Sequence, residues 1–138
     1  SIIKTNVMLD PAALDVPGYI DHNNGRAMSL SYHHVFGEDE TTLIDASPPD
    51  HVGTDKSIPK ILLFYAGERM NLDLFCQKFT QSLTEPGYPS KSVDMVSLDH
   101  GQMNSHIGMI GDSMTDLIMK LHAGEEPSEF PAKIEPNQ

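Results

Sequence analysis

The fold is decided by a stretch of ten residues, SVDMVSLDHG, at positions 92–101. Its first seven residues form a strand-like segment, and Asp99-His100-Gly101 then begin a short polar loop. Beyond the loop, residues 113–122 have the period of an amphipathic helix with one apolar side. The region is therefore interpreted as a strand, a loop that carries a histidine, and a closing helix.

Two further strands are predicted earlier in the chain. Residues 2–9 are rich in Ile, Val and Leu and end at the turn signal Asp10-Pro11. The run ILLFYAG at residues 61–67 is almost continuously apolar, which suits a parallel strand buried on both faces.

A helix is predicted between the second and third strands. Its apolar residues recur at i, i+3, i+4, i+7 and i+11 as Leu72, Phe75, Cys76, Phe79 and Leu83. Asn71 is the expected N-cap and Pro86-Gly87 the stop, whereas Ser113 is the expected N-cap of the closing helix. Because strands joined by a helical crossover pair in parallel, we expect an α/β fold whose mostly parallel sheet is flanked by helices.

Two segments fall outside this pattern. Residues 16–57 keep neither the helical nor the strand period, and such a long segment is usually functional or contains short helices of its own. We expect it to form a lid-like cover over the carboxyl ends of the strands, where open α/β sheets bind ligands. Residues 124–138 are polar, contain three prolines and predict an exposed tail after a domain part that spans residues 1–123.

The composition excludes several classes of partner. The net charge is −11, from 20 acidic and 9 basic residues, whereas nucleic acid or an anionic membrane would require Lys/Arg clusters. One cysteine excludes an internal disulfide, and no apolar run is long enough to span a membrane. Residues 1–6 lack the basic start and apolar core of a signal peptide, which favours the cytoplasm.

Three strands and two clear helices make a poor independent domain. A parallel sheet needs helices on both faces, and the first strand would expose a long unpaired edge. We therefore expect another chain, or a missing segment, to complete the sheet.

Three stretches together resemble the α/β-hydrolase superfamily, in its esterase/lipase and arylformamidase-like branch. VMLD at 7–10 with ALDVP at 13–17 is similar to the strand and loop after the nucleophile helix, and residues 46–68 are similar to the lead into the next strand. Residues 99–115 resemble the histidine loop and the final helix. The nucleophile elbow Gly-x-Ser-x-Gly does not occur in the sequence, so the resemblance implies the carboxy-terminal half of such a fold, paired with an amino-terminal chain that carries the elbow.

The resemblance also implies the site residues. His100 maps to the general base of acyl transfer, whose partners are a serine and a carboxylate that orients the histidine. Met70 stands where the family's Asp usually follows the second strand, so the acid stays open between Asp73, Asp10, Glu68 and a lost acid. No cofactor or metal is expected, because adjacent His33 and His34 could not both face one site from an extended strand.

The implied function is that of a serine hydrolase acting on a small-molecule carboxylic ester or amide once both halves are assembled. One alternative is a degenerate hydrolase-fold protein that binds without catalysis. Met70 at the position of the family's acid is consistent with this alternative. Another is an enzyme of the same fold that catalyses a lyase or cyclisation step, because one fold supports many reactions.

Overall fold

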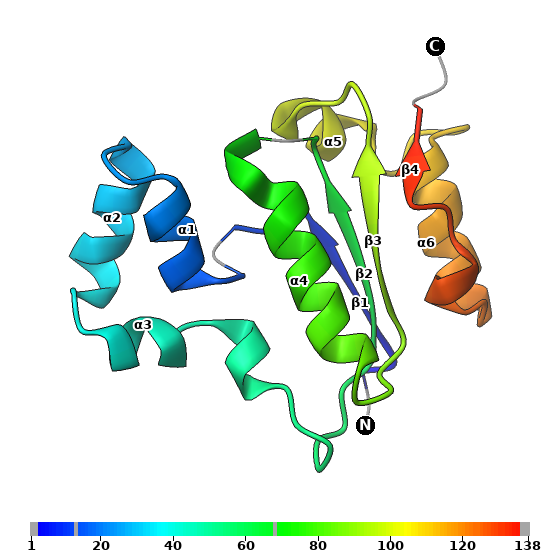
Figure 1. Ribbon diagram of the computed structural model, residues 1–138. Helices are drawn as coiled ribbons and strands as arrows, with labels where there is room; N and C mark the ends of the chain where they lie inside the picture. Colours follow the sequence, from blue (N-terminus) through cyan, green and yellow to red (C-terminus); the bar gives the residue numbers. More distant parts are fainter. Residues whose placement is uncertain (1–2, 13, 68, 136–138) are drawn as a thin grey trace.

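The protein is described by a computed structural model that covers residues 3–12, 14–67 and 69–135 (Figure 1). Four strands form one parallel sheet in the order β1-β2-β3-β4. Their bounds are Thr5–Leu9 for β1, Lys60–Tyr65 for β2, Ser90–Met95 for β3 and Lys133–Ile134 for β4. The expected α/β class with a parallel sheet is confirmed.

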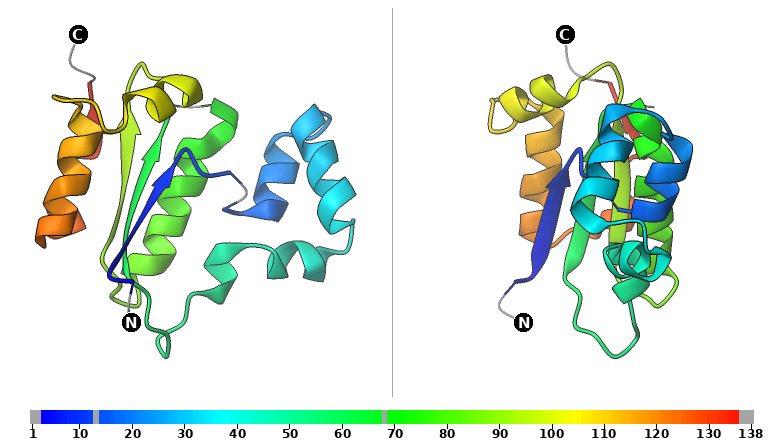
Figure 2. Two further views of the ribbon diagram at one scale, coloured as in Figure 1. Left: turned by 180° about the vertical axis from the view of Figure 1, so that it is seen from behind. Right: turned by 90° about the vertical axis from the view of Figure 1, so that its left-hand side faces the viewer.

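A helix covers each face of the sheet. Helix α4 (Leu72–Thr84) packs on one face and α6 (Ser113–Ala123) on the other (Figures 1 and 2). Successive strand residues point to opposite faces, so Leu63 meets the α4 core while Leu62 and Phe64 meet the α6 core. The predicted stripe on α4 is buried along its whole length: Leu72, Phe75, Cys76, Phe79 and Leu83.

The start of α6 differs from expectation, whereas α4 begins after the expected N-cap residue. Asp112, not Ser113, is the N-cap of α6, because its carboxylate accepts the Thr115 N–H at 2.7 Å. Asn71 is the N-cap residue of α4, as predicted, but its backbone is left-handed (φ 60°) and its side chain makes no capping hydrogen bond. Gly124 ends α6 with φ 104°, as predicted.

The loop expected after β3 contains a short helix, α5 (His100–His106). Asp99 is its N-cap, and Gln102 completes a reciprocal capping box. In this box each side chain accepts a hydrogen bond from the backbone N–H of the other residue. His100 is therefore the first residue of a helix rather than part of an irregular loop.

Residues 16–57 form α1 (Val16–His22), α2 (Ala27–Phe36), α3 (Glu40–Asp45) and the short 3-10 helix η1 (Pro48–His51). In both figures they lie beside α4, on the side of the molecule farthest from β4. Contact with the carboxyl edge of the sheet runs through α1 and the 3-10 helix η2 (Arg69–Asn71) that follows β2. This lateral position differs from the expected cover over the strand ends, and a lid-like role stays a prediction.

The prediction of an exposed tail over residues 124–138 is wrong for residues 124–135, the part that the structure describes. The 3-10 helix η3 (Pro127–Glu129) leads into Phe130, which is buried in the α6 core, and β4 then pairs with β3. Burial of the Phe130 ring and pairing of β4 with β3 both hold this polar segment against the sheet. Residues 136–138 lie outside the described residues.

Strand β1 forms one edge of the sheet within this chain. Its pairing with a strand of another polypeptide therefore stays a prediction. Among the described residues, no helix is long and apolar enough to cross a membrane.

Candidate active site

Asp10 lies directly after β1, where its carboxylate is held by the sheet. Its N–H donates to the Phe64 carbonyl at 2.7 Å, and its Oδ1 accepts the Ala66 N–H at 3.1 Å. The backbone of Asp10 is left-handed (φ 45°), a conformation that Asp adopts more readily than most residues. Its side chain is fully buried, so the carboxylate is fixed at the carboxyl edge between β1 and β2.

His100 reaches this carboxylate from the other side of β2. Its Nδ1 lies 2.8 Å from Asp10 Oδ2, although the two residues are 90 positions apart in sequence. Because an ionised carboxylate only accepts, Nδ1–H is the donor, which leaves the lone pair of a neutral ring on Nε2. The His100 side chain is 56% exposed, and its Nε2 makes no hydrogen bond within the described part of the chain.

The topology explains why these residues meet. β1 and β3 flank β2 on either side and run parallel to it, so their carboxyl ends lie at the same edge of the sheet. Asp10 follows the first of these strands directly, and the turn and N-cap after β3 deliver His100. Ligand sites of open α/β sheets lie at this edge.

The structure separates the candidate acids. Asp10 pairs with His100, whereas Asp73 occupies the first turn of α4 and makes no ion pair or hydrogen bond with His100 among the described residues. A carboxylate there stabilises the helix dipole, the other role considered for it. Glu68 lies outside the described residues.

Met70 takes part in a packed turn at the carboxyl end of β2. Its Sδ accepts a hydrogen bond from the Tyr19 hydroxyl at 2.9 Å, and its backbone is left-handed with φ 52°. Asn23, almost fully buried, donates to the Met70 carbonyl at 3.4 Å. The position that the family resemblance assigns to an acid is thus occupied by a structural side chain.

Sequence reasoning missed two groups that position the pair. No sequence pattern predicts the Ala66 N–H as a partner, because it is a backbone donor placed by the fold. The capping box does have a sequence pattern, an Asp followed three residues later by Gln, which occurs here as Asp99-x-x-Gln102.

Attack by the cysteine thiol and binding of a metal ion are both disfavoured within the described residues. Burial, and secondarily the charges of Asp10 and Asp73, raise the pKa of the Cys76 thiol to about 12, so this cysteine is a poor nucleophile. Within the described residues, no group of three His, Cys, Asp or Glu side chains could hold a metal ion.

The pair can therefore take up and return a proton at Nε2, provided that a reacting group is brought to it. The His100 side chain is 56% exposed, and Nδ1, not Nε2, is the ring nitrogen that contacts the carboxylate. Comparisons with protein-family models, with curated proteins and with solved structures give no match, so the interpretation of this site depends on its geometry.

Proposed function

We propose that this chain supplies the histidine and the carboxylate of a serine-type acyl-transfer site that hydrolyses a carboxylic ester or amide. The observation that carries the proposal is the 2.8 Å contact between His100 Nδ1 and Asp10 Oδ2. It joins a buried, hydrogen-bonded acid to a histidine that is half exposed. In this proposal the serine lies outside residues 1–138, on a second polypeptide or on a further segment, because these residues contain no Gly-x-Ser-x-Gly elbow.

In this mechanism His100 Nε2 accepts the proton of the serine hydroxyl while its oxygen attacks the carbonyl carbon. Asp10 holds the ring and stabilises the imidazolium that forms. The imidazolium then donates this proton to the leaving alcohol or amine. In the second half the same Nε2 accepts a proton from water while the water oxygen attacks the acyl carbon, and the imidazolium then returns this proton to the serine oxygen as the acyl–serine bond breaks and the acid product leaves.

The free edge of β1 is the natural place for the second polypeptide. An unpaired edge offers a row of backbone donors and acceptors to an added strand. A strand that pairs in parallel with β1 has its carboxyl end at the edge where Asp10 and His100 lie. A serine in the turn after that strand would come close to Nε2.

A non-catalytic binding role is the second candidate, and the structural use of Met70 favours it. In that case the pair of Asp10 and His100 would be a remnant that stabilises the sheet edge. The two candidate functions make different predictions. The catalytic function requires a nucleophile whose reactivity depends on His100, and the binding function does not.

The test starts from the tagged chain purified from its native source together with whatever binds it. Intact-mass analysis identifies a second polypeptide, and a fluorophosphonate probe labels an activated serine. We expect labelling of the second polypeptide and turnover of an activated ester, both reduced about a thousandfold or more by His100→Ala. His106→Ala, in the last turn of the same helix, is the matched control and should leave both unchanged. Labelling and turnover that His100→Ala does not alter would reject the catalytic role, and no labelling at all would favour the binding role.

A further inference from the structure

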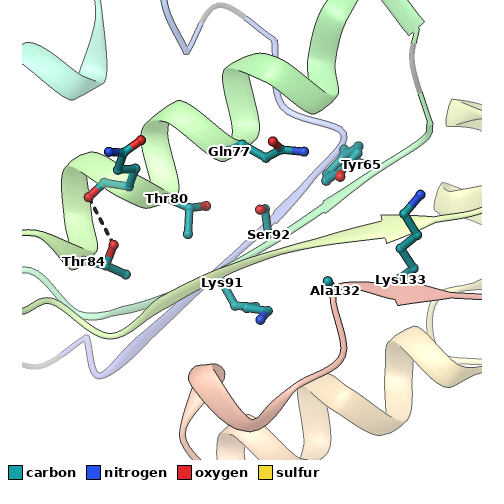
Figure 3. Close-up of a pocket in the computed structure, with 9 residues that line it drawn as sticks. Tyr65, Gln77, Thr80, Thr84, Lys91, Ser92, Ala132 and Lys133 are labelled. Atoms are coloured by element: carbon teal, nitrogen blue, oxygen red, sulfur yellow. Dashed lines mark hydrogen bonds between the residues drawn. The ribbon is translucent and has the colours of Figure 1, made fainter.

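The turn between α1 and α2 contains the one Asn-Gly dipeptide of the sequence, Asn24-Gly25. Both residues are exposed, and the turn is closed by a hydrogen bond from the Arg26 N–H to the Asn23 carbonyl at 3.0 Å. No residue of this turn lines the cavity of about 380 Å³ between α4, β3 and β4 that Figure 3 shows. The turn is therefore a separate feature of the surface.

The two groups that can react with each other in this dipeptide are accessible. The Asn24 side chain and the Gly25 N–H make no hydrogen bond within the described part of the chain. Gly25 has φ 80°, and a Cβ placed on it would have no heavy atom within 4 Å, so no other element packs against it. Glycine also gives the backbone the freedom to bring its nitrogen toward the side chain of the preceding residue.

The other asparagines among the described residues lack these features. Asn23 is buried and bonded through its amide group, and Asn71 is only half-buried but precedes a leucine. Asn6 is exposed in β1 before a valine, whereas Asn104 is exposed in α5, where its amide donates to the His100 carbonyl at 2.8 Å. Neither exposed asparagine is followed by a glycine, so Asn24 stands apart from both.

We propose that Asn24 is a site of spontaneous deamidation through a cyclic imide. The Gly25 nitrogen loses its proton and bonds to Asn24 Cγ, and the Cγ–Nδ2 bond breaks to release ammonia. Water then opens the five-membered ring at one of its two carbonyl carbons. The product is an aspartyl residue when the new bond breaks, and an isoaspartyl residue when the original peptide bond breaks.

The modification changes both the charge and the backbone of the turn. A neutral amide becomes a carboxylate two positions before Arg26, and the isoaspartyl form adds one carbon to the backbone. Both changes fall next to Asn23, whose amide donates to the Met70 carbonyl at 3.4 Å. The modified residue therefore adjoins the contact between α1 and η2, at the carboxyl end of β2.

Peptide mapping by mass spectrometry tests the proposal on the full chain incubated at mildly alkaline pH. We expect the Asn24 peptide to gain about 1 Da before the Asn6 and Asn104 peptides change, and to contain isoaspartate as well as aspartate. Because the turn is exposed and needs little local opening, the rate in the folded protein should lie within about tenfold of the rate in urea.

Gly25→Ala is the informative variant, because a Cβ next to the attacking nitrogen should slow deamidation severalfold. Gly37→Ala is the matched control: Gly37 has φ 83° and equally open surroundings but does not follow an asparagine, so the rate at Asn24 should stay unchanged. If the strain at φ 80° impairs folding of Gly25→Ala, the same comparison is made in urea, where every variant is unfolded.

Four results would each overturn the proposal. They are a rate at Asn24 no faster than at Asn6 or Asn104, a folded rate more than about tenfold below the unfolded one, aspartate without isoaspartate, and equal rates in Gly25→Ala and Gly37→Ala.

Discussion

Asp10 and Asp94 are both aspartates of the parallel sheet, and their surroundings differ sharply. Asp10 is fully buried and is bonded on both oxygens, by the Ala66 N–H and by His100. Asp94 is 13% exposed, has a lysine at 3.6 Å and retains a buried oxygen without a partner. One carboxylate is therefore held so that it contacts another side chain, whereas the other retains a buried oxygen that no described residue satisfies.

The difference follows from where each residue stands on its strand. Asp10 comes after β1, where the carboxyl edge brings neighbouring strand ends and α5 together. Asp94 lies within β3 next to the two-residue strand β4, where the α4 face is less completely covered. Position relative to the strand end, more than residue type, separates the two roles.

The largest expected effect is on turnover. Asp10→Asn places an amide next to His100 Nδ1, which favours the wrong tautomer, and should lower kcat/KM for an activated ester roughly ten-thousandfold in the assembled protein. Asp73→Asn, the matched change at the other candidate acid, should cost less than about threefold because it removes only a helix-dipole contact. Equal losses in the two variants would remove the distinction between these acids.

The reactivity of Cys76 should report the charge of Asp10. Its pKa of about 12 leaves little thiolate at pH 8, so alkylation by iodoacetamide should be roughly a thousandfold slower than in unfolded protein. Burial is the main cause and the charge of Asp10 the next, so Asp10→Asn should speed the reaction moderately, whereas Asp94→Asn should not. A native rate within tenfold of the unfolded rate would contradict this description of Cys76.

Stability should separate the same two aspartates. Asp10→Ala leaves the buried Ala66 N–H without its acceptor and should reduce the free energy of unfolding by about 1–3 kcal/mol. Asp94→Ala removes an oxygen that already lacks a donor, and it also removes an ion pair with a lysine that is 74% exposed. The change in the free energy of unfolding should therefore be within about 0.5 kcal/mol of zero. Urea denaturation measures both, and a larger loss for Asp94→Ala would reverse the comparison.

The smallest effect is expected at the helix that carries His100. Asp99→Ala removes the N-cap of α5, and Asp112→Ala removes that of α6, each at about 1 kcal/mol of stability. Turnover should fall severalfold for Asp99→Ala alone, because α5 carries His100 and α6 does not. Similar turnover in both variants would mean that the cap does not position His100.

Much of this architecture could be predicted from the sequence because its signals are local and strong. The stripe from Leu72 to Leu83 and the apolar run of β2 each determine one element. For residues 16–57 the sequence predicted short helices only as one possibility and did not place them, since α1 and α3 are short and bury few residues on a cluster of their own. Phe130 and β4 were missed because a single buried ring is hidden in a polar composition.

For the site, the sequence supplied His100 and a set of possible acids, and the geometry selected among them. Asp10 looked like an ordinary residue before Pro11, and only its left-handed backbone and the Ala66 N–H direct its carboxylate to His100. Long-range pairing of this kind depends on strand order, which local patterns do not contain.

The most direct test of the central claim is the tautomer of His100, measured by ¹⁵N NMR through the couplings of its ring nitrogens. If Asp10 orients the ring, the neutral imidazole carries its proton on Nδ1, and Asp10→Asn moves that proton to Nε2. A wild-type ring protonated on Nε2, or a tautomer that does not respond to Asp10→Asn, would contradict the pairing on which the proposed function depends.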